Sequence, residues 1–237
     1  RSYAVGASLD KSEYDEVAEN VWIAKSAKVA PTAYINGPCI IGKDAEIRHC
    51  AFIRGNAIVG EGAVVGNSTE LKNVVLFNKV QVPHYNYVGD SVLGYRAHMG
   101  AGSITSNVKS DKALVKVRCD GEVIETGLKK FGAMIGDNVE VGCGSVLNPG
   151  TVVGRESNIY PLSSVRGYVE AGSIYKKQGE VIGELIDTNA DFLVCQITIY
   201  CVCCCICGIL SVCCVCLCGL FCCCIICRCG SVSGLAA

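Results

Sequence analysis

The residues from Lys72 to Asn107 include side chains of the types that acyl transfer requires. Lys72 is followed by His84 and Tyr87, and then by the glycine-rich segment HMGAGSITSN at residues 98–107. Histidine is the usual general base near neutral pH, a lysine ammonium holds an anion, and amides of glycine-rich turns can stabilise an oxyanion. The stretch therefore offers a base, an anion-binding cation and amide donors.

Each of these residues also has a purely structural interpretation. His84 could satisfy a turn in an irregular coil, and Arg54 and Lys72 could be solvated charges on an outer face. A shared phosphate would suit the two cations instead, because a guanidinium binds it through two parallel hydrogen bonds and an ammonium adds a point charge. The residue types alone leave these alternatives open.

A six-residue repeat supplies the elements that must position these side chains. Aliphatic residues recur every six positions, at Ile23, Val29, Ile35, Ile41, Ile47, Ile53, Val59, Val65 and Leu71. A small or compact residue follows four positions after each of them, from Ala27 to Val75. A period of six fits neither an α-helix nor a coiled-coil heptad, and it is a known β-solenoid period. Each repeat is then one short strand and one turn, and about three repeats make a triangular coil.

The same frame returns after an interruption, at Ile135, Val141, Leu147, Val153, Ile159 and Val165. Between the two runs, KALVKVRCDGEVIETGLKK alternates polar and apolar residues around Asp120-Gly121, a dipeptide typical of type I′ hairpin turns. We therefore expect an all-β fold, with a parallel β-helix over residues 21–185 from which a β-hairpin projects within residues 110–134.

The repeat loses its step in the region that holds the candidate site. The intervals from Leu71 to Leu76 and from Val88 to Leu93 are five residues instead of six. A shortened step moves one turn inward or outward without unwinding the solenoid. We interpret the two short steps as the feature that directs Lys72, His84 and Tyr87 toward a common cleft.

Three segments carry a resemblance to a known family: RGNAIVGEGAVVGNSTELKN, VPHYNYVGDSVLG and MGAGSITSNV. They resemble the acetyltransferase half of the bacterial bifunctional glucosamine-1-phosphate acetyltransferase/N-acetylglucosamine-1-phosphate uridyltransferase. They are also similar to its archaeal sugar-1-phosphate nucleotidylyltransferase relatives and to short proteins related to UDP-N-acetylglucosamine pyrophosphorylase. The likeness runs from about Asn20 to Gly183, and its H-x-x-Y-x-G-D and G-A-G motifs are more specific than the hexapeptides.

The resemblance implies a left-handed β-helix, a homotrimer with sites between adjacent subunits, and acetyl-CoA as acetyl donor. The implied reaction is N-acetylation of an amino-sugar 1-phosphate, glucosamine 1-phosphate or galactosamine 1-phosphate, in nucleotide-sugar biosynthesis. His84 would be the general base, and Arg54 and Lys72 would hold the phosphate. The other implied substrate-binding residues are Glu70, Tyr87, His98 and Asn107, and the implied acetyl-CoA contacts are Ala101, Gly102 and Cys143.

The sequence departs from the family pattern at two of these positions. His98 stands where relatives have a substrate-contacting asparagine, which puts the sugar specificity in question, and Cys143 replaces a serine of the CoA site. In addition, no glycine-rich nucleotide loop of the G-x-G-T-R-M kind follows a strand. We therefore do not expect uridylyl transfer from this chain alone.

Two other classes of function remain as alternatives. The solenoid could be a non-catalytic trimerising or regulatory module for a separate nucleotidylyltransferase, and a scaffold of that kind should not bind acetyl-CoA. Alternatively, His49, His84 and His98 could form a zinc site across a trimer interface. Their gaps of 35 and 14 residues disfavour zinc, so we predict no metal.

Composition divides the chain into a body and a tail. The formal net charge of −1 argues against a nucleic-acid partner. Of the 19 cysteines, 15 lie at or after Cys195, and the scattered remainder indicates a reduced, cytoplasmic protein. We expect residues 1–20 to be a lead-in without a signal peptide, and the start to be truncated.

The tail, residues 186–237, is rich in cysteine and apolar. Within it, residues 192–227 are 36 residues without a charged side chain, 14 of them cysteine. That length exceeds the roughly 20 apolar residues that span a bilayer. A membrane anchor, a metal-thiolate or disulfide segment and a read-through in a wrong frame all remain open for this segment.

Overall fold

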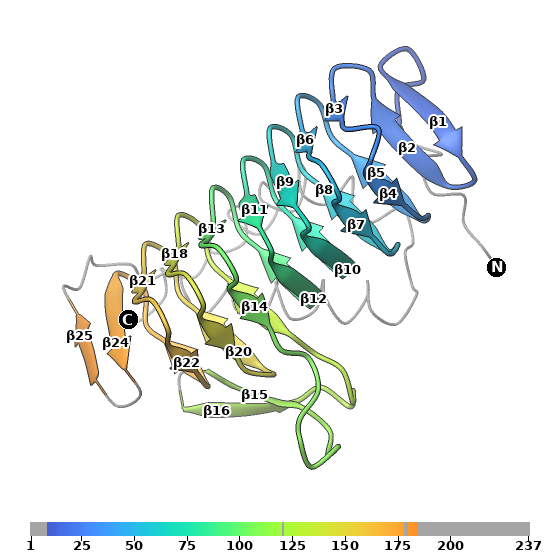
Figure 1. Cartoon of the computed structure of the whole chain (residues 1–237). Helices are drawn as coiled ribbons and strands as arrows, with labels where there is room; N and C mark the ends of the chain where they lie inside the picture. Colours follow the sequence, from blue (N-terminus) through green and yellow to red (C-terminus); the bar gives the residue numbers. More distant parts are fainter. Residues whose placement is uncertain (1–8, 120, 178–179, 184–237) are drawn as a thin grey trace, which may run out of the picture.

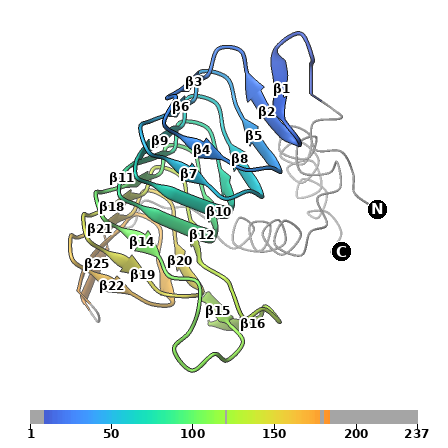
Figure 2. The same ribbon diagram turned by 45° about the vertical axis from the view of Figure 1, so that its right-hand side comes forward.

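A parallel β-solenoid makes up the body of the protein. The computed structural model describes residues 9–119, 121–177 and 180–183. Short strands, each separated by a turn, stack coil upon coil in these residues (Figure 1). The stacks form three walls, which are best seen in the turned view of Figure 2. This is the left-handed parallel β-helix that the repeat and the resemblance predicted.

We name the three walls by the order in which the chain meets them. The first face consists of β2 (Val21–Ala24), β5 (Cys39–Ile41), β8 (Ala57–Val59), the C-terminal halves of β10 (Glu70–Leu76) and β12 (Tyr87–Leu93), β17 (Ala133–Ile135), β20 (Thr151–Val153) and β23 (Tyr168–Val169). The second face consists of β3 (Lys28–Val29), β6 (Glu46–Ile47), β9 (Val64–Asn67), β11 (Gln81–His84), β13 (His98–Met99), β18 (Glu140–Val141), β21 (Asn158–Ile159) and β24 (Ser173–Lys177). The third face consists of β4 (Tyr34–Ile35), β7 (Phe52–Ile53), the N-terminal halves of β10 and β12, β14 (Ile104–Thr105), β19 (Val146–Leu147) and β22 (Ser164–Val165).

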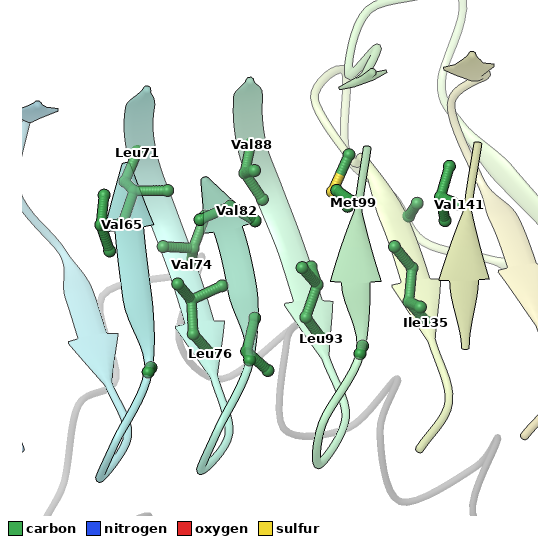
Figure 3. Packing of buried hydrophobic residues seen from close by; sticks show 14 of the residues in the cluster. Val65, Leu71, Val74, Leu76, Val82, Val88, Leu93, Met99, Ile135 and Val141 are labelled. Atoms are coloured by element: carbon green, nitrogen blue, oxygen red, sulfur yellow. The ribbon is translucent and has the colours of Figure 1, made fainter. Parts of the chain in front are cut away.

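The aliphatic residues of the repeat fill the interior of the solenoid. Parallel pairing places Leu71 beside Ile53 on one side and Val88 on the other, so that like positions stack along the axis (Figure 3). All three side chains are 0% exposed. Burial of each such side chain is worth about 1.5–3 kcal/mol, and the stacks therefore hold the coils in one register.

The two five-residue steps tighten a single corner. β10 and β12 run from the third face to the first as continuous strands, whereas β7 and β8 are separate strands in the preceding coil. Asn73 and Asp90 occupy the tightened corner with φ near the left-handed region, 51° in each. Asn and Asp adopt this conformation at lower cost than most side chains.

An antiparallel hairpin is inserted at this same corner after Asn107. Its strands are β15 (Lys116–Cys119) and β16 (Glu122–Glu125). Val115 and Val117 are 0% exposed and belong to a cluster with Val92 and Met134 of the first face. Because one side of the hairpin is packed against the solenoid, the expectation that it projects from the coil is not confirmed.

The ends of the solenoid have antiparallel strands. β1 (Tyr14–Ala18), within the expected lead-in, pairs with β2, and β25 (Glu180–Gly183) pairs with β24. The cysteine-rich tail, including the candidate anchor at residues 192–227, lies outside the described residues. A search of the described residues found no helix with the length and apolarity to span a membrane.

Candidate functional site

Four of the predicted site residues share one corner of the solenoid. We call the turn from the second face to the third face corner 2–3. Here the Gly102 N–H donates to the His84 carbonyl at 3.0 Å, and the Gly144 N–H donates to the Ala101 carbonyl at 2.9 Å. His84, Ala101 with Gly102, and Cys143 with Gly144 therefore occupy this corner on three successive coils.

His84 is exposed at the end of β11, and its turn is fixed from the inside by Asn86. The Asn86 side chain is 2% exposed; its Oδ1 accepts the His84 backbone N–H at 3.1 Å. Its Nδ2 donates to the carbonyls of Gly100 at 2.9 Å and Ser103 at 3.0 Å. Asn86 thus ties the turn that carries His84 to the glycine-rich turn of the next coil. The His84 imidazole forms no hydrogen bond with any residue that the structure describes.

Sequence reasoning missed Asn86, although a signal was present. Asn86 occupies the frame position that holds Ala33 and Ala51 in earlier coils, where the repeat calls for a small residue. A buried polar side chain at such a position must find hydrogen-bond partners. The same position holds Thr69 and Ser103 on the two adjoining coils, so Asn86 is the largest polar side chain of these three and marks a specific polar contact.

The glycine-rich turn combines close packing with an open surface. A Cβ on Gly100 would lie 2.7 Å from the Cys143 backbone nitrogen, whereas a Cβ on Gly102, which has φ +70°, would meet no atom within 4 Å. Ala101 and Cys143 are both exposed, and Cys143 is a free thiol. The Ala101 N–H is without a hydrogen-bond partner among the described residues.

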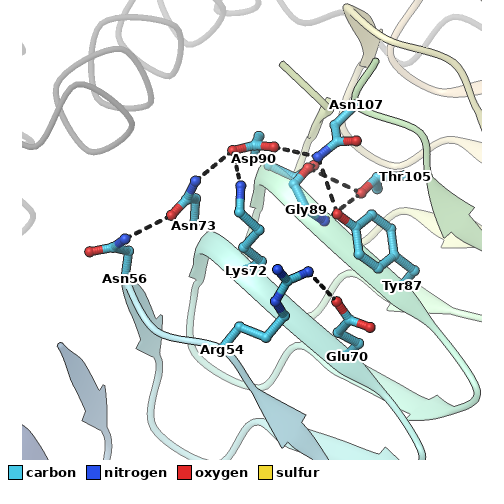
Figure 4. Close-up of polar contacts among 11 residues, drawn as sticks. Arg54, Asn56, Glu70, Lys72, Asn73, Tyr87, Gly89, Asp90, Thr105 and Asn107 are labelled. Carbon is cyan, nitrogen blue, oxygen red and sulfur yellow. Dashed lines mark hydrogen bonds and ion pairs between the residues drawn. The ribbon is translucent and has the colours of Figure 1, made fainter. Parts of the chain in front are cut away.

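A second group of predicted residues lies at corner 3–1, where the third face turns into the first (Figure 4). The carboxylate of Asp90, 0% exposed, accepts from Lys72 Nζ at 3.4 Å and from Asn73 Nδ2 at 2.7 Å. It also accepts from Asn107 Nδ2, which donates in addition to the Tyr87 hydroxyl at 3.2 Å. The structure therefore brings Lys72, Tyr87 and Asn107 together around a carboxylate.

Tyr87 lies on the third face between the two corners. Its hydroxyl and ring would come within 2.5–2.8 Å of a Cβ on Gly89, so the ring rests against a position that only glycine leaves open. The phenol is partly buried, and this burial raises the pKa of Tyr87 above its ordinary value. The hydroxyl therefore keeps its proton at neutral pH and can still donate a hydrogen bond.

Arg54 and Glu70 form the outermost pair of this group. Arg54 Nη1 lies 2.8 Å from Glu70 Oε1, and the two side chains are 44% and 33% exposed. The hydrogen bond to Glu70 raises the pKa of the Arg54 guanidinium. Glu70 is directly beside Tyr87 in the parallel register of β10 and β12, so the pair borders the Lys72 group.

His98 is the one predicted site residue that lies apart from both groups within the chain. It is on β13 of the second face, and its Nδ1 lies 2.6 Å from Glu140 Oε2 on the neighbouring strand β18. Among the described residues, the side chain of His98 forms no hydrogen bond or ion pair with the third face.

Asp90 and Asn73 are the functional candidates that residue-by-residue reasoning missed at corner 3–1. Asp90 was present in the H-x-x-Y-x-G-D motif, but its role could not be read from the motif. The third face thus has an exposed histidine and the open Ala101 amide at one corner, and two cations at the other. This arrangement could hold an anionic group at corner 3–1 while a nucleophile reacts beside His84.

Comparison with known proteins agrees with the fold. Residues 35–169, more than half of the chain, match the family model described as the GMPPB C-terminal domain. A protein of Escherichia coli K12 named as an uncharacterized acetyltransferase, YaiX, is 32% identical over 180 residues, which are 76% of this chain and 76% of that protein.

Longer relatives match over a smaller part of their length. The bifunctional sugar-1-phosphate nucleotidylyltransferase/acetyltransferase of Sulfurisphaera tokodaii is 37% identical over 112 residues, 47% of this chain and 28% of that protein. The matched part of this chain thus spans about 28% of that relative's length. Among solved structures, a hexapeptide transferase family protein of Anaplasma phagocytophilum is similar with a TM-score of 0.46 at 20% identity, covering 77% of this chain and 90% of that chain.

Proposed function

Because the chain belongs to the family of GMPPB C-terminal domains, and has their hexapeptide solenoid fold, we propose that it is an acetyl-CoA-dependent N-acetyltransferase. Its substrate is an amino-sugar 1-phosphate, glucosamine 1-phosphate or galactosamine 1-phosphate, used in nucleotide-sugar biosynthesis. One observation carries the proposal: the third face has an exposed base at one corner and two cations at the other. The names of the E. coli and S. tokodaii relatives, both acetyltransferases, support the reaction class.

His84 is the general base of this reaction. It takes a proton from the sugar amine as the amine nitrogen attacks the carbonyl carbon of the acetyl thioester. A new C–N bond forms, the C–S bond breaks, and the proton passes to the departing sulfur, so that an amide and a thiol result. A base at this place contributes about 10²–10⁴ in rate.

Corner 2–3 receives the acetyl donor. On two of its coils the exposed residues Ala101, Gly102 and Cys143 have little or no side-chain bulk, and the open space at Gly102 admits a chain of atoms close to the backbone. The Ala101 N–H, which has no partner within the described part of the chain, is the hydrogen-bond donor for the acetyl oxygen, where negative charge develops during attack.

Corner 3–1 receives the sugar phosphate. Arg54 and Lys72 supply the positive charge, and Glu70, Tyr87 and Asn107 contact the sugar. In this proposal the protein is a homotrimer, and His98 reaches the substrate from the second face of an adjacent subunit. Within one chain His98 lies apart from the other candidate residues, which supports the proposal that it contributes to the site of an adjacent subunit.

A direct assay tests the proposed function. Purified protein is mixed with acetyl-CoA and either glucosamine 1-phosphate or galactosamine 1-phosphate, and release of the CoA thiol is followed. We expect turnover of at least one of the two amino sugars and none of the corresponding N-acetylated sugar, which has no free amine. If neither sugar nor related amines react, the acetyltransferase proposal is wrong.

The Arg54–Glu70 pair leads to a prediction about phosphate binding. Glu70 competes with a phosphate for the guanidinium, so Glu70→Gln should tighten the binding of inorganic phosphate, measured by calorimetry. Exposed ion pairs are worth little, and the expected gain is up to about five-fold. The matched control is Glu46→Gln, which breaks the similarly exposed Arg48–Glu46 pair on the second face and should leave phosphate affinity unchanged. A loss of phosphate affinity in Glu70→Gln would contradict the competition.

The alternative is a non-catalytic trimerising or regulatory module associated with a sugar-1-phosphate nucleotidylyltransferase. It is favoured by the family description, which is that of a C-terminal domain, and by the partial match to the bifunctional S. tokodaii relative. Calorimetry with acetyl-CoA separates the two functions, because a module that only assembles subunits should show no binding.

A further inference from the structure

Asp90 is the centre of the polar group at corner 3–1, yet it cannot touch a ligand. Its carboxylate is 0% exposed and accepts from Lys72, Asn73 and Asn107. A carboxylate removed from water is strongly unfavourable unless it is paired and hydrogen-bonded. Hydrogen bonds from the three donors stabilise the buried carboxylate, and each donor side chain is held in place by its bond to Asp90.

The backbone and the neighbouring amides leave Asp90 little freedom. Its carbonyl accepts the Gly132 N–H at 2.8 Å, where the chain returns from the hairpin. On the preceding coils Asn56 Nδ2 donates to Asn73 Oδ1 at 2.9 Å, and Asn73 Nδ2 donates to Asp90 Oδ1. Asn56 and Asn73 have the same φ of 51° as Asp90. The row of hydrogen bonds thus runs in one direction and ends on the carboxylate (Figure 4).

This arrangement decides which atoms Asn107 and Lys72 can offer. An ionised carboxylate only accepts hydrogen bonds, so the Asn107 NH₂ group must face Asp90. Nδ2 donates to both Asp90 and Tyr87, which leaves the Asn107 Oδ1 without a donor among the described residues. An ammonium has three N–H groups, and Lys72 uses one of them for Asp90.

We propose that Asp90 is a positioning residue that sets the donor and acceptor pattern of the ligand site. Through it, Lys72 offers N–H groups to an anion while Asn107 offers a carbonyl oxygen to a hydroxyl or an amine. The pattern fits a phosphate monoester with a neighbouring hydrogen-bond donor, such as a sugar 1-phosphate. The proposal rests on the proposed function for its ligand class.

The main test compares Asp90→Asn, Lys72→Met and the double variant in calorimetric titrations with glucosamine 1-phosphate. Asn keeps the shape of Asp and tolerates its positive φ, and the melting temperature of Asp90→Asn checks that the fold is retained. We expect it to weaken binding about ten-fold, the scale of a hydrogen bond to a charged group. Because part of the effect of Asp90 passes through Lys72, the double variant should lose clearly less affinity than the product of the two single losses.

Thr151→Val is the control variant, because it should lower the stability of the protein without moving Lys72 or Asn107. Thr151 is 0% exposed and hydrogen-bonded to the Asn148 carbonyl at 2.7 Å in a later coil. Its removal should lower the melting temperature and leave the affinity unchanged. If Asp90→Asn binds glucosamine 1-phosphate as tightly as the wild type, the positioning role is wrong. It is also wrong if the fold-loss of affinity in the double variant equals the product of the fold-losses in the two single variants.

A ligand-free measurement keeps this inference separate from the proposed function. Trace acetylation with acetic anhydride, read by peptide mass spectrometry, modifies the neutral lysine amine and therefore reports how readily each lysine leaves its ion pair. Lys72 should be labelled several-fold faster in Asp90→Asn than in the wild type, relative to the exposed Lys112 in the same sample. If Lys72 labelling responds but the wild type neither binds nor acetylates the amino sugars, the proposed function is wrong and the positioning of Lys72 stands. An unchanged labelling rate would refute the positioning.

Discussion

Replacement of His84 by alanine is expected to lower the rate of acetyl transfer by about 10²–10⁴ while the protein stays folded. The imidazole is exposed, and it makes no hydrogen bond within the described residues. The two contacts that fix this turn involve the backbone of residue 84, with Asn86 and with Gly102. Alanine preserves both of them, so the melting temperature should change little. The measurement is kcat/KM with acetyl-CoA and the preferred amino-sugar phosphate.

His49 provides a matched control for this prediction. It lies at the same corner 2–3, two coils before His84, about 10 Å away at the usual strand spacing. Its ring contacts Thr32 Oγ1 at 2.7 Å and Cys50 Sγ at 3.2 Å, and it has no part in the proposed chemistry. His49→Ala should therefore keep wild-type turnover. Full activity in a folded His84→Ala protein would show that another group is the base.

Substitution of Gly66 by alanine is expected to destabilise the protein by about 3 kcal/mol or more. A Cβ on Gly66 would lie 1.6 Å from the Pro83 carbonyl oxygen and 2.3 Å from the Pro83 Cα. Both obstacles are backbone atoms, which cannot rotate away as a side chain can. The corner must open to admit the methyl group, and the His84 turn directly after Pro83 would move with it.

Urea unfolding at a fixed protein concentration measures this effect, with circular dichroism and the fluorescence of the single tryptophan, Trp22, as probes. Gly127→Ala is the control, because Gly127 has φ +68° but a Cβ there would meet nothing within 4 Å. That variant should lose about 1 kcal/mol through backbone strain alone. An equal loss in the two variants would mean that the tight stacking at corner 2–3 is not the cause.

The fold was predictable because the aliphatic residue of each six-residue repeat is the one whose side chain points inward. Ile53, Leu71 and Val88 are aliphatic positions of the repeat and are all buried. The shortened steps fall at corner 3–1, beside the candidates Lys72, Tyr87 and Asn107, whereas His84 lies at corner 2–3. The H-x-x-Y-x-G-D and G-A-G motifs named His84, Tyr87 and Ala101 as candidates. Local spacing carried this information, because neighbouring repeats in a solenoid are also neighbours in space.

The contacts between coils were decided only by the tertiary structure. A residue usually meets its neighbour on the next coil 16–18 positions away, as in Arg54–Glu70 and Lys72–Asp90. The hairpin insertion stretches this to 42 positions for His98 and Glu140. Spacing in the sequence therefore could not show that Cys143 stacks on Ala101, or that His98 faces a carboxylate.

The sequence by itself thus determined the solenoid, its three-walled frame and the stretch that carries the candidate chemistry. The structure alone showed that Asn86 and Asp90 hold the turn of His84 and the side chains of Lys72 and Asn107 from inside. Both are polar residues at places where the repeat tolerates several side chains, and their value lies in partners on other coils. Hydrogen bonding of buried polar groups depends on which coils are stacked, and stacking is a property of the folded chain.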